Sequence, residues 1–254
     1  MPVRPFFLRW PHAGRREAAG GSGRAGGGDM GAVISGRYVQ YGCGFNAPEG
    51  WVSYDSSPSL RILRLPGVGR WAYRASGNAQ TFPKGVRYGN IVKGLPEEDG
   101  SCDGIYASHV LEHLSRADCQ VALGRTWRLL KPGGVFRLVV PDLEGRARRY
   151  LQARAAGRTD AADRFLEESY LGLERRPSGV VGAAKRALGA SQHLWMYDRP
   201  SMQARLEAAG FVAIRECRPG DSGDPMFDRV EDPTRFVDAG TGVEEVAFEA
   251  RRPL

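Results

Sequence analysis

Two turns near the start of the chain carry residue types that could bind a nucleotide. The first, Gly42-Cys43-Gly44, follows the run 38–41, which predicts a short strand. Glycines there let the backbone approach a ligand closely, and open α/β sheets bind ligands beyond the carboxyl ends of their strands. The second turn begins at Asp55, after a strand predicted over 51–54, and its carboxylate could accept hydrogen bonds from both hydroxyls of a ribose. Simpler explanations exist, because glycines occur in ordinary turns and an Asp before Ser-Ser-Pro can cap a helix.

Polar residues also follow two strands predicted in the middle of the chain. A strand over 104–107 ends in Ser108 and His109, and an apolar, β-branched run over 135–140 ends in Pro141-Asp142. His109 is a candidate general base or a residue that positions an acceptor, although it could only pack against or cap the next helix. Asp142 could hold an acceptor hydroxyl or amine, or cap the helix that follows it. His109 and Asp142 are the candidate catalytic residues.

A helix that stops sharply must join these two strands. Lys131 is expected in its last turn, where a cation meets the negative end of the helix dipole. Pro132 cannot continue the helix, and Gly133-Gly134 permits the positive φ values of a reversal. The run 135–140 is then expected to be a strand covered on both faces.

A metal site has one formal signature in the chain. His109-x-x-Glu112-His113 matches an inverted zinc-peptidase motif. That motif requires a helix interior, whereas His109 follows directly on a strand, and no third ligand is apparent. The sequence therefore predicts no metal.

The segments LEHL (111–114) and LLKPGG (129–134), together with the glycine turn, resemble class I S-adenosylmethionine-dependent methyltransferases. The resemblance implies S-adenosylmethionine as the cofactor. It also implies an α/β fold, a seven-stranded, mostly parallel Rossmann-like sheet with a helical insertion after the fifth strand.

The resemblance also implies roles for single residues. Gln40 and Asn46 replace the acidic residue and the third glycine of the family's glycine motif, and Asn90 replaces an acid that receives the adenine amino group. Asp55 is implied to bind the ribose, and residues leaving the strand at Ser108 face the methyl group. The residues implied to bind the cofactor are Gln40, Gly42, Cys43, Gly44, Asp55, Asn90 and Ser108.

The segment 144–192 is expected to be a helical, basic cap over the site. It leads into His193-x-Trp195-x-Tyr197-Asp198, which is similar to a segment of small methyltransferases from bacterial polysaccharide and glycan gene clusters. His193, Trp195 and Tyr197 are expected to border the acceptor pocket. The basic cap favours an anionic or sugar-containing acceptor, although solvated helix faces would explain the charge equally simply.

Composition and charge bound the remaining possibilities. Residues 1–30 are rich in Gly and Arg and are expected to be a disordered tail, with Met30 a possible true start and 31–254 the methyltransferase domain. The net charge of +7 comes mainly from arginine, without the basic stripe that nucleic-acid binding requires. The four cysteines form no CxxC pair, which suits a reducing cytoplasm. A small-molecule or glycan acceptor and at most peripheral membrane contact are expected.

The sequence therefore predicts a methyltransferase that acts on an oxygen or nitrogen. A non-catalytic, methyltransferase-like S-adenosylmethionine-binding protein is the alternative, because Gln40, Asn46 and Asn90 depart from the family pattern. A nicotinamide-dependent oxidoreductase is disfavoured, since its glycine turn would be longer and LLKPGG would have no role.

Overall fold

The computed structural model describes residues 36–75, 81–172 and 192–254. Gly36–Leu254 form one compact unit. The predicted tail over 1–30, the possible start at Met30 and residues 173–191 of the predicted cap lie outside the described residues.

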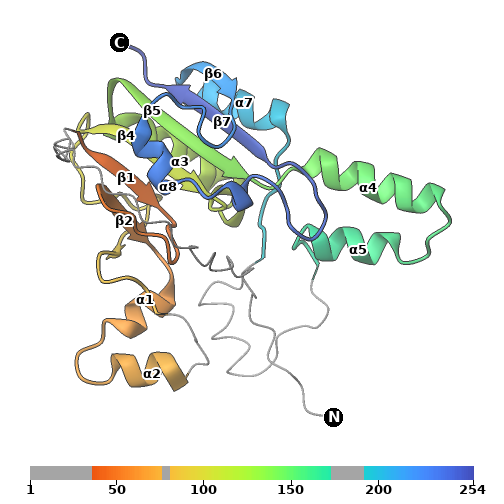
Figure 1. Cartoon of the computed structure of the whole chain (residues 1–254), viewed down its shortest axis with the longest axis horizontal. Helices are drawn as coiled ribbons and strands as arrows, with labels where there is room; N and C mark the ends of the chain where they lie inside the picture. Colours follow the sequence, from red (N-terminus) through yellow and green to blue (C-terminus); the bar gives the residue numbers. More distant parts are fainter. Residues whose placement is uncertain (1–35, 76–80, 173–191) are drawn as a thin grey trace, which may run out of the picture. The chain divides into compact units, whose positions relative to one another are not determined.

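A seven-stranded sheet organises the fold, in the order β3-β2-β1-β4-β5-β7-β6 (Figure 1). The strands from β3 to β5 pair in parallel, and β7 runs antiparallel between β5 and β6. The prediction of a seven-stranded sheet is confirmed, and the sheet is parallel except at β7. The strands are β1 (Tyr38–Tyr41), β2 (Trp51–Asp55), β3 (Arg87–Tyr88), β4 (Cys102–Ser108), β5 (Leu130–Val140), β6 (Val212–Glu216) and β7 (Val246–Arg251).

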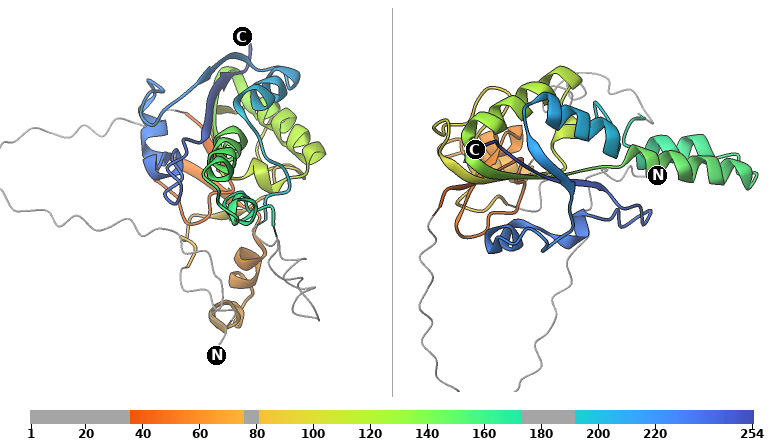
Figure 2. Two further views of the ribbon diagram at one scale, coloured as in Figure 1. Left: turned by 90° about the vertical axis from the view of Figure 1, so that its right-hand side faces the viewer. Right: turned by 90° about the horizontal axis from the view of Figure 1, so that it is seen from above.

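Helices cover both faces of this sheet (Figure 2). Leu123 of α3 and Leu206 of α7 pack with Val39 on one face, whereas Phe227 of α8 packs with Tyr38 and Trp51 on the other. The helices are α1 (Pro58–Leu63), α2 (Gly69–Ala75), η1 (Leu111–His113), α3 (Arg116–Leu129), α4 (Leu143–Ala155), α5 (Ala161–Glu168), α7 (Arg199–Ala208), α8 (Pro225–Val230) and η2 (Pro233–Arg235).

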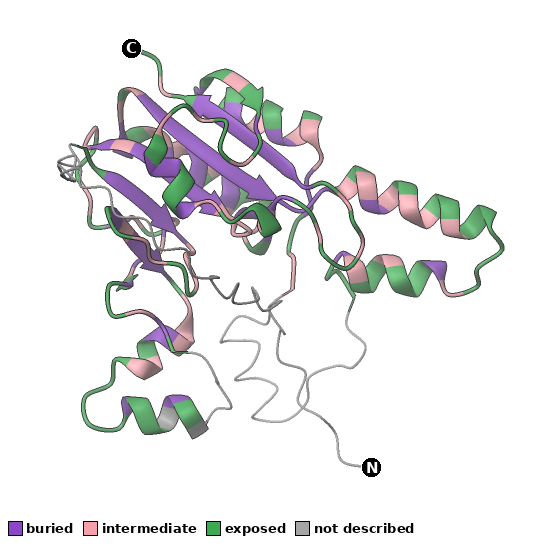
Figure 3. Cartoon of the chain, viewed as in Figure 1, coloured by how far each residue is buried: buried purple, intermediate pink, exposed green. Residues whose placement is uncertain are grey.

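The central strands are buried on both sides, as their apolar sequences predict (Figure 3). All six residues from Val135 to Val140 are buried. The loop 42–50 between β1 and β2 contains no helix. The end of β1 is therefore joined to the start of the parallel strand β2 by a loop rather than by a crossover helix.

The junction between α3 and β5 differs from its prediction at Lys131. α3 ends at Leu129, so Lys131 lies beyond the helix, and its Nζ is 2.8 Å from both carboxylate oxygens of Asp103. The ammonium group binds the start of β4 instead of the helix dipole. Gly133, near the start of β5, has the expected positive φ of +75°, which permits a sharp turn of the chain there.

Two helices follow the fifth strand, and their exposed surfaces are large (Figure 3). α4 and α5 pack against each other, with the rings of Tyr150 and Phe165 5.7 Å apart. α4 begins at the carboxyl end of β5, where Asp142 caps it. These helices are the described part of the predicted cap.

Candidate functional site

Glycine is required where β1 ends. Gly42 has a φ of +65°, and a Cβ on it would lie 2.3 Å from Cγ2 of Val110. Gly44 has a φ of +54°, but a Cβ there would meet no atom within 4 Å. The first glycine thus permits close packing of the turn on the following loop, and the second leaves open space beside the backbone. Open space at Gly44 is what a nucleotide lying along the turn needs.

Asp55 is held against this glycine turn. Its Oδ2 accepts a hydrogen bond from the backbone N–H of Gly44 at 2.9 Å, and its Oδ1 accepts one from Ser57 at 2.7 Å. Ser57 occupies the N-cap of α1, so Asp55 shapes the approach to that helix without capping it. Each carboxylate oxygen keeps a second lone pair for a ribose hydroxyl. The two nucleotide-binding turns of the sequence therefore meet in space.

The substituted residue Gln40 has a local structural role. Its buried Nε2 donates to the carbonyl oxygen of Asn46 at 2.9 Å and to Ser53 Oγ at 2.8 Å. A carboxylate, the family's usual group, could not donate to that carbonyl. Asn46 in turn donates from Nδ2 to the Val230 carbonyl at 2.8 Å, which ties the loop to the end of α8. Gln40 and Asn46, which depart from the family's glycine motif, thus stabilise the turn together.

The side-chain oxygen of Asn90, the atom predicted to accept from the adenine amino group, stabilises a local turn. Its Oδ1 accepts from the backbone N–H groups of Val92 at 2.9 Å and Lys93 at 3.2 Å. Its amide nitrogen makes no hydrogen bond to the described residues, so Asn90 can also offer a donor at this edge. The assignment of Asn90 to adenine stays a prediction.

His109 leaves β4 in a left-handed backbone conformation, with a φ of +54°. Its backbone N–H donates to Val139 at 2.8 Å, and its Nε2 lies 2.9 Å from the carbonyl oxygen of Arg235. Burial, followed by the charge of Arg235, lowers the pKa of His109 to about 3. A neutral ring that donates from Nε2 leaves Nδ1 as an acceptor of low basicity. This environment suits positioning of an acceptor better than removal of its proton.

Glu112 is a buried carboxyl beside His109. Neither carboxylate oxygen has a hydrogen-bond partner among the described residues, and burial raises the pKa of Glu112 to about 8. Its Oε1 lies 3.6 Å from His109 Nδ1 and 3.9 Å from His113 Nε2. Atoms of Glu112, His113 and His193 that could bind a metal all lie within 4.8 Å of one another. His193 is the third potential ligand, which the sequence did not reveal.

Asp142 acts as a helix cap in this structure. Its carboxylate accepts from the backbone N–H groups of Glu144 at 3.2 Å and Gly145 at 3.0 Å, and it lies 3.2 Å from Arg199 Nη1. The capping alternative from the sequence is therefore observed. The binding of an acceptor by Asp142 stays a prediction, and it would compete with these contacts.

Arg146 does not fit the explanation that the basic residues of the cap form solvated helix faces. It is buried, and its guanidinium contacts Glu245, Asp238 and the Asp142 carbonyl at 2.9–3.0 Å. Tyr197 is likewise fully buried, whereas Trp195 is exposed. Position in the sequence gave no signal for the burial of Arg146, because its acidic partners Asp238 and Glu245 lie 92 and 99 positions away.

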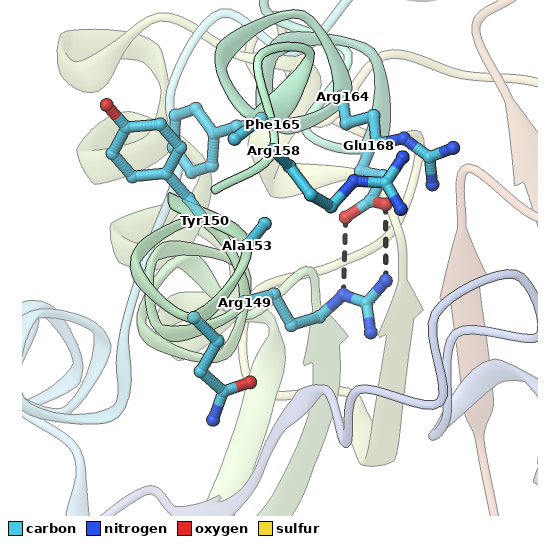
Figure 4. A pocket seen from close by; sticks show the side chains of 9 residues that line it. Arg149, Tyr150, Ala153, Arg158, Arg164, Phe165 and Glu168 are labelled. Atoms are coloured by element: carbon cyan, nitrogen blue, oxygen red, sulfur yellow. Dashed lines mark hydrogen bonds and ion pairs between the residues drawn. The ribbon is translucent and has the colours of Figure 1, made fainter. Parts of the chain in front are cut away.

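A charged pocket lies between α4 and α5, away from the cofactor candidates (Figure 4). Glu168 lies between the helices and its carboxylate accepts from Arg149 at 3.3 Å. The pocket's lining includes Arg158, Arg164, Tyr150 and Phe165 but none of the residues predicted to bind the cofactor. It is a basic, partly aromatic surface on the described part of the cap.

Several solved structures are similar to this chain at low sequence identity. An S-adenosylmethionine-dependent methyltransferase from Methanosarcina mazei is 18% identical, with a TM-score of 0.46 and coverage of 88% of this chain and 95% of that chain. A counterpart from Archaeoglobus fulgidus is 14% identical, with a TM-score of 0.44 and 85% of each chain covered. The Burkholderia thailandensis 1,6-didemethyltoxoflavin N1-methyltransferase, solved with S-adenosylhomocysteine, is 16% identical with a TM-score of 0.43, covering 86% of this chain and 72% of that one.

Among curated sequences, an uncharacterized 37.1 kDa protein of a Streptomyces fradiae transposon is 29% identical over 139 residues. The match covers 54% of this chain and 39% of that protein. The family described as "Methyltransferase domain" matches residues 36–216, which include every predicted site residue. The chain belongs to this methyltransferase-domain family.

Proposed function

We propose that this protein moves the methyl group of S-adenosylmethionine to an oxygen or nitrogen of a small, anionic or sugar-containing acceptor. The observation that carries the proposal is the meeting of Asp55 with the Gly44 backbone, next to open space at the ends of β1 and β2. A carboxylate held in this way can receive ribose hydroxyls without moving.

The cofactor supplies an electrophilic methyl group on a positively charged sulfur. The protein must align the acceptor with that methyl group and exclude water. His109, fixed through Nε2 and strained in its backbone, offers Nδ1 on the acceptor side. A neutral ring there can accept a hydrogen bond from an acceptor hydroxyl or amine and so orient its lone pair toward the methyl group.

Exposed arginines on α4 and α5 support an anionic acceptor. Arg149, Arg158 and Arg164 line the pocket between these helices, and the aromatic rings beside them could stack on a sugar. Their ion pairs with Glu168 and Asp160 are surface pairs, which an anionic ligand can displace at small cost. A role in polysaccharide synthesis inside the cytoplasm is the setting we propose for such an acceptor.

No helix among the described residues is long and apolar enough to cross a membrane. A lipid-linked sugar acceptor would therefore be reached at a membrane surface, through peripheral contact of the basic cap.

Calorimetric titration with S-adenosylhomocysteine tests the cofactor site. Asp55→Ala should weaken binding by about 1–3 kcal/mol, because charged hydrogen bonds to the ribose are lost. Asp99→Ala, which removes an exposed carboxylate from a distant loop, is the matched control. Unchanged affinity in a folded Asp55→Ala protein would contradict the proposal.

The alternative function is binding without catalysis. It is favoured by the low pKa of His109 and by the use of Asn90 Oδ1 in a local turn. A screen of nucleotide-sugars, lipid-linked sugars and small amines, with radiolabelled methyl donor, separates the two functions. Methyl transfer to any of these acceptors that is lost in the Asp55→Ala protein excludes a purely binding role.

A further inference from the structure

Three metal-binding side chains meet beyond the carboxyl end of β4. Glu112 and His113 come from η1, and His193 comes from the segment that leads into α7. One ligand atom of each lies within 4.8 Å of the other two. We propose that Glu112, His113 and His193 bind one divalent transition-metal ion.

Hydrogen bonds from outside the cluster orient the two imidazoles. His113 Nδ1 lies 3.1 Å from the Gln192 carbonyl oxygen, so the ring donates from Nδ1 and leaves the Nε2 lone pair free. That Nε2 is the atom 3.9 Å from Glu112 Oε1. His193 Nδ1 lies 3.2 Å from the Met196 sulfur. A carbonyl that fixes the tautomer of a histidine is the usual outer contact of a metal ligand.

The backbone holds the two halves of the cluster together across a long stretch of sequence. The carbonyl oxygen of Glu112 accepts from the N–H groups of Leu194 at 2.7 Å and Trp195 at 3.1 Å. The N–H of His193 donates to Tyr170 at 3.2 Å. His193 is therefore fixed beside Glu112 by main-chain contacts and not by a chance side-chain orientation.

The buried carboxyl of Glu112 is the second, independent indication. It is fully buried and neither oxygen has a hydrogen-bond partner among the described residues. Arg235 attracts its charge, and His109 Nδ1 lies 3.6 Å away. A carboxylate buried without hydrogen bonds is costly, and a cation between Glu112, His113 and His193 would satisfy it.

The ligand set indicates the class of ion. Two imidazoles and one carboxylate suit Zn²⁺, Co²⁺, Mn²⁺ or Fe²⁺ rather than Ca²⁺, which prefers oxygen ligands. Ligand distances of about 2.0–2.2 Å require ligand atoms within about 4 Å of one another, so small side-chain rotations must close the site. His113 is exposed on one side, which leaves a coordination position open to water or an acceptor oxygen.

An open position beside His109 would also serve methyl transfer. A bound metal lowers the pKa of a coordinated hydroxyl and so eases the loss of its proton. The weakly basic His109 is poorly suited to removing that proton itself. This consequence rests on the proposed function, whereas binding of the metal does not.

The test is titration of chelator-treated, full-length protein with Co²⁺ and Zn²⁺. We expect one Co²⁺ per chain, visible absorption of a low-symmetry site, and displacement of Co²⁺ by Zn²⁺. His193→Ala and Glu112→Gln should each weaken binding roughly 100-fold or more, because each removes a direct ligand. Glu98→Gln, outside the cluster, should bind as the unaltered protein does.

Two variants keep the test decisive if one misfolds. His193 is only half-buried, so His193→Ala should fold even if Glu112→Gln does not, and a thermal melt verifies this. Absence of stoichiometric Co²⁺ and Zn²⁺ binding, or equal binding by a folded His193→Ala protein, overturns the metal site. Titration with S-adenosylhomocysteine on the same samples separates the outcomes. A protein that binds S-adenosylhomocysteine but no metal overturns the metal site and leaves the proposed function standing. A protein that binds metal but no S-adenosylhomocysteine overturns the proposed function and leaves the metal site standing.

Discussion

At the ends of β1 and β2, side chains contact backbone groups close to them in the sequence. Asp55 binds Gly44, eleven positions earlier, and Ser57, two positions later. At the ends of β4 and β5 the contacts join distant segments instead. His109 and Arg235 are 126 positions apart, and Arg146 and Glu245 are 99 apart. The predicted cofactor edge is thus held largely by local contacts, with the bond from Asn46 to Val230 as a long-range exception, whereas the predicted acceptor edge is held by contacts between distant segments.

Charge distinguishes the two edges as well. The cofactor edge uses one carboxylate, backbone N–H groups and open space. The acceptor edge buries Glu112, Arg146, Asp142 and Glu245 within a few residues of the strand ends. Buried charges are costly unless paired, so this edge is sensitive to substitutions that leave a partner alone. The comparison predicts that substitutions at the acceptor edge lower the free energy of unfolding, whereas substitutions at the cofactor edge weaken cofactor binding.

The largest expected effect is on stability, through Arg146. Arg146→Met leaves the buried carboxylate of Glu245 without its partner, and we expect the free energy of unfolding to fall by about 3–5 kcal/mol. Arg148→Met, two positions away, removes only an exposed ion pair with Glu144 and should cost at most about 1 kcal/mol. Urea denaturation measures both variants. Equal losses would show that the buried network does not distinguish the acceptor edge.

The same contrast explains which features of the structure could be predicted from the sequence. The strand ends, the glycine turn and Asp55 were predictable, because each motif lies within one short stretch and has a local physical cause. The capping box of α7, formed by Asp198 and Ser201, was predictable for the same reason. The position of Lys131 was not, since a salt bridge with Asp103 of β4 competes with the helix dipole.

Burial of charged residues was the hardest feature to predict. Arg146 stands in a segment whose other described arginines are exposed or half-buried, and nothing in the neighbouring sequence distinguishes it. Arg137 interrupts an apolar strand, where it binds Glu231 and Glu249 on the α8 face of the sheet. The approach of His193 to Glu112 likewise depends on main-chain pairing that no spacing in the sequence reveals.

The next effect separates affinity from turnover. Once an acceptor is known, His109→Ala should lower kcat roughly 10–100-fold, because the ring orients the acceptor in the transition state. The dissociation constant of S-adenosylhomocysteine should stay within about twofold, in contrast to Asp55→Ala. Steady-state kinetics and calorimetry measure the two quantities. A His109→Ala protein with full turnover would leave the ring only a structural role.

A smaller effect is expected from the cap of α4. Asp142→Ala removes two hydrogen bonds to the helix N-terminus and the pair with Arg199, and should lower the free energy of unfolding by about 1–2 kcal/mol. Asp142→Asn retains the capping oxygen and should recover most of this loss. A thermal melt measures both. Failure of Asn to recover stability would indicate that the charge at Asp142, and not the cap, matters.

The last effect concerns the thiol of Cys43 at the cofactor edge. Burial, with a further contribution from the charge of Asp55, raises the pKa of Cys43 to about 12. The thiol therefore stays protonated at pH 8, and its alkylation by iodoacetamide should be roughly a thousandfold slower than that of an ordinary cysteine, because only the thiolate reacts. Raising the pH toward 10 should speed the reaction about tenfold per pH unit, since the thiolate fraction rises in that proportion.

Asp55→Asn removes a nearby negative charge, lowers the thiol pKa and should accelerate labelling at pH 8. Mass spectrometry of the labelled peptide follows each rate. Fast labelling of Cys43 at pH 8, unaffected by Asp55→Asn, would show that the glycine turn is more open than the contact between Asp55 and Gly44 implies.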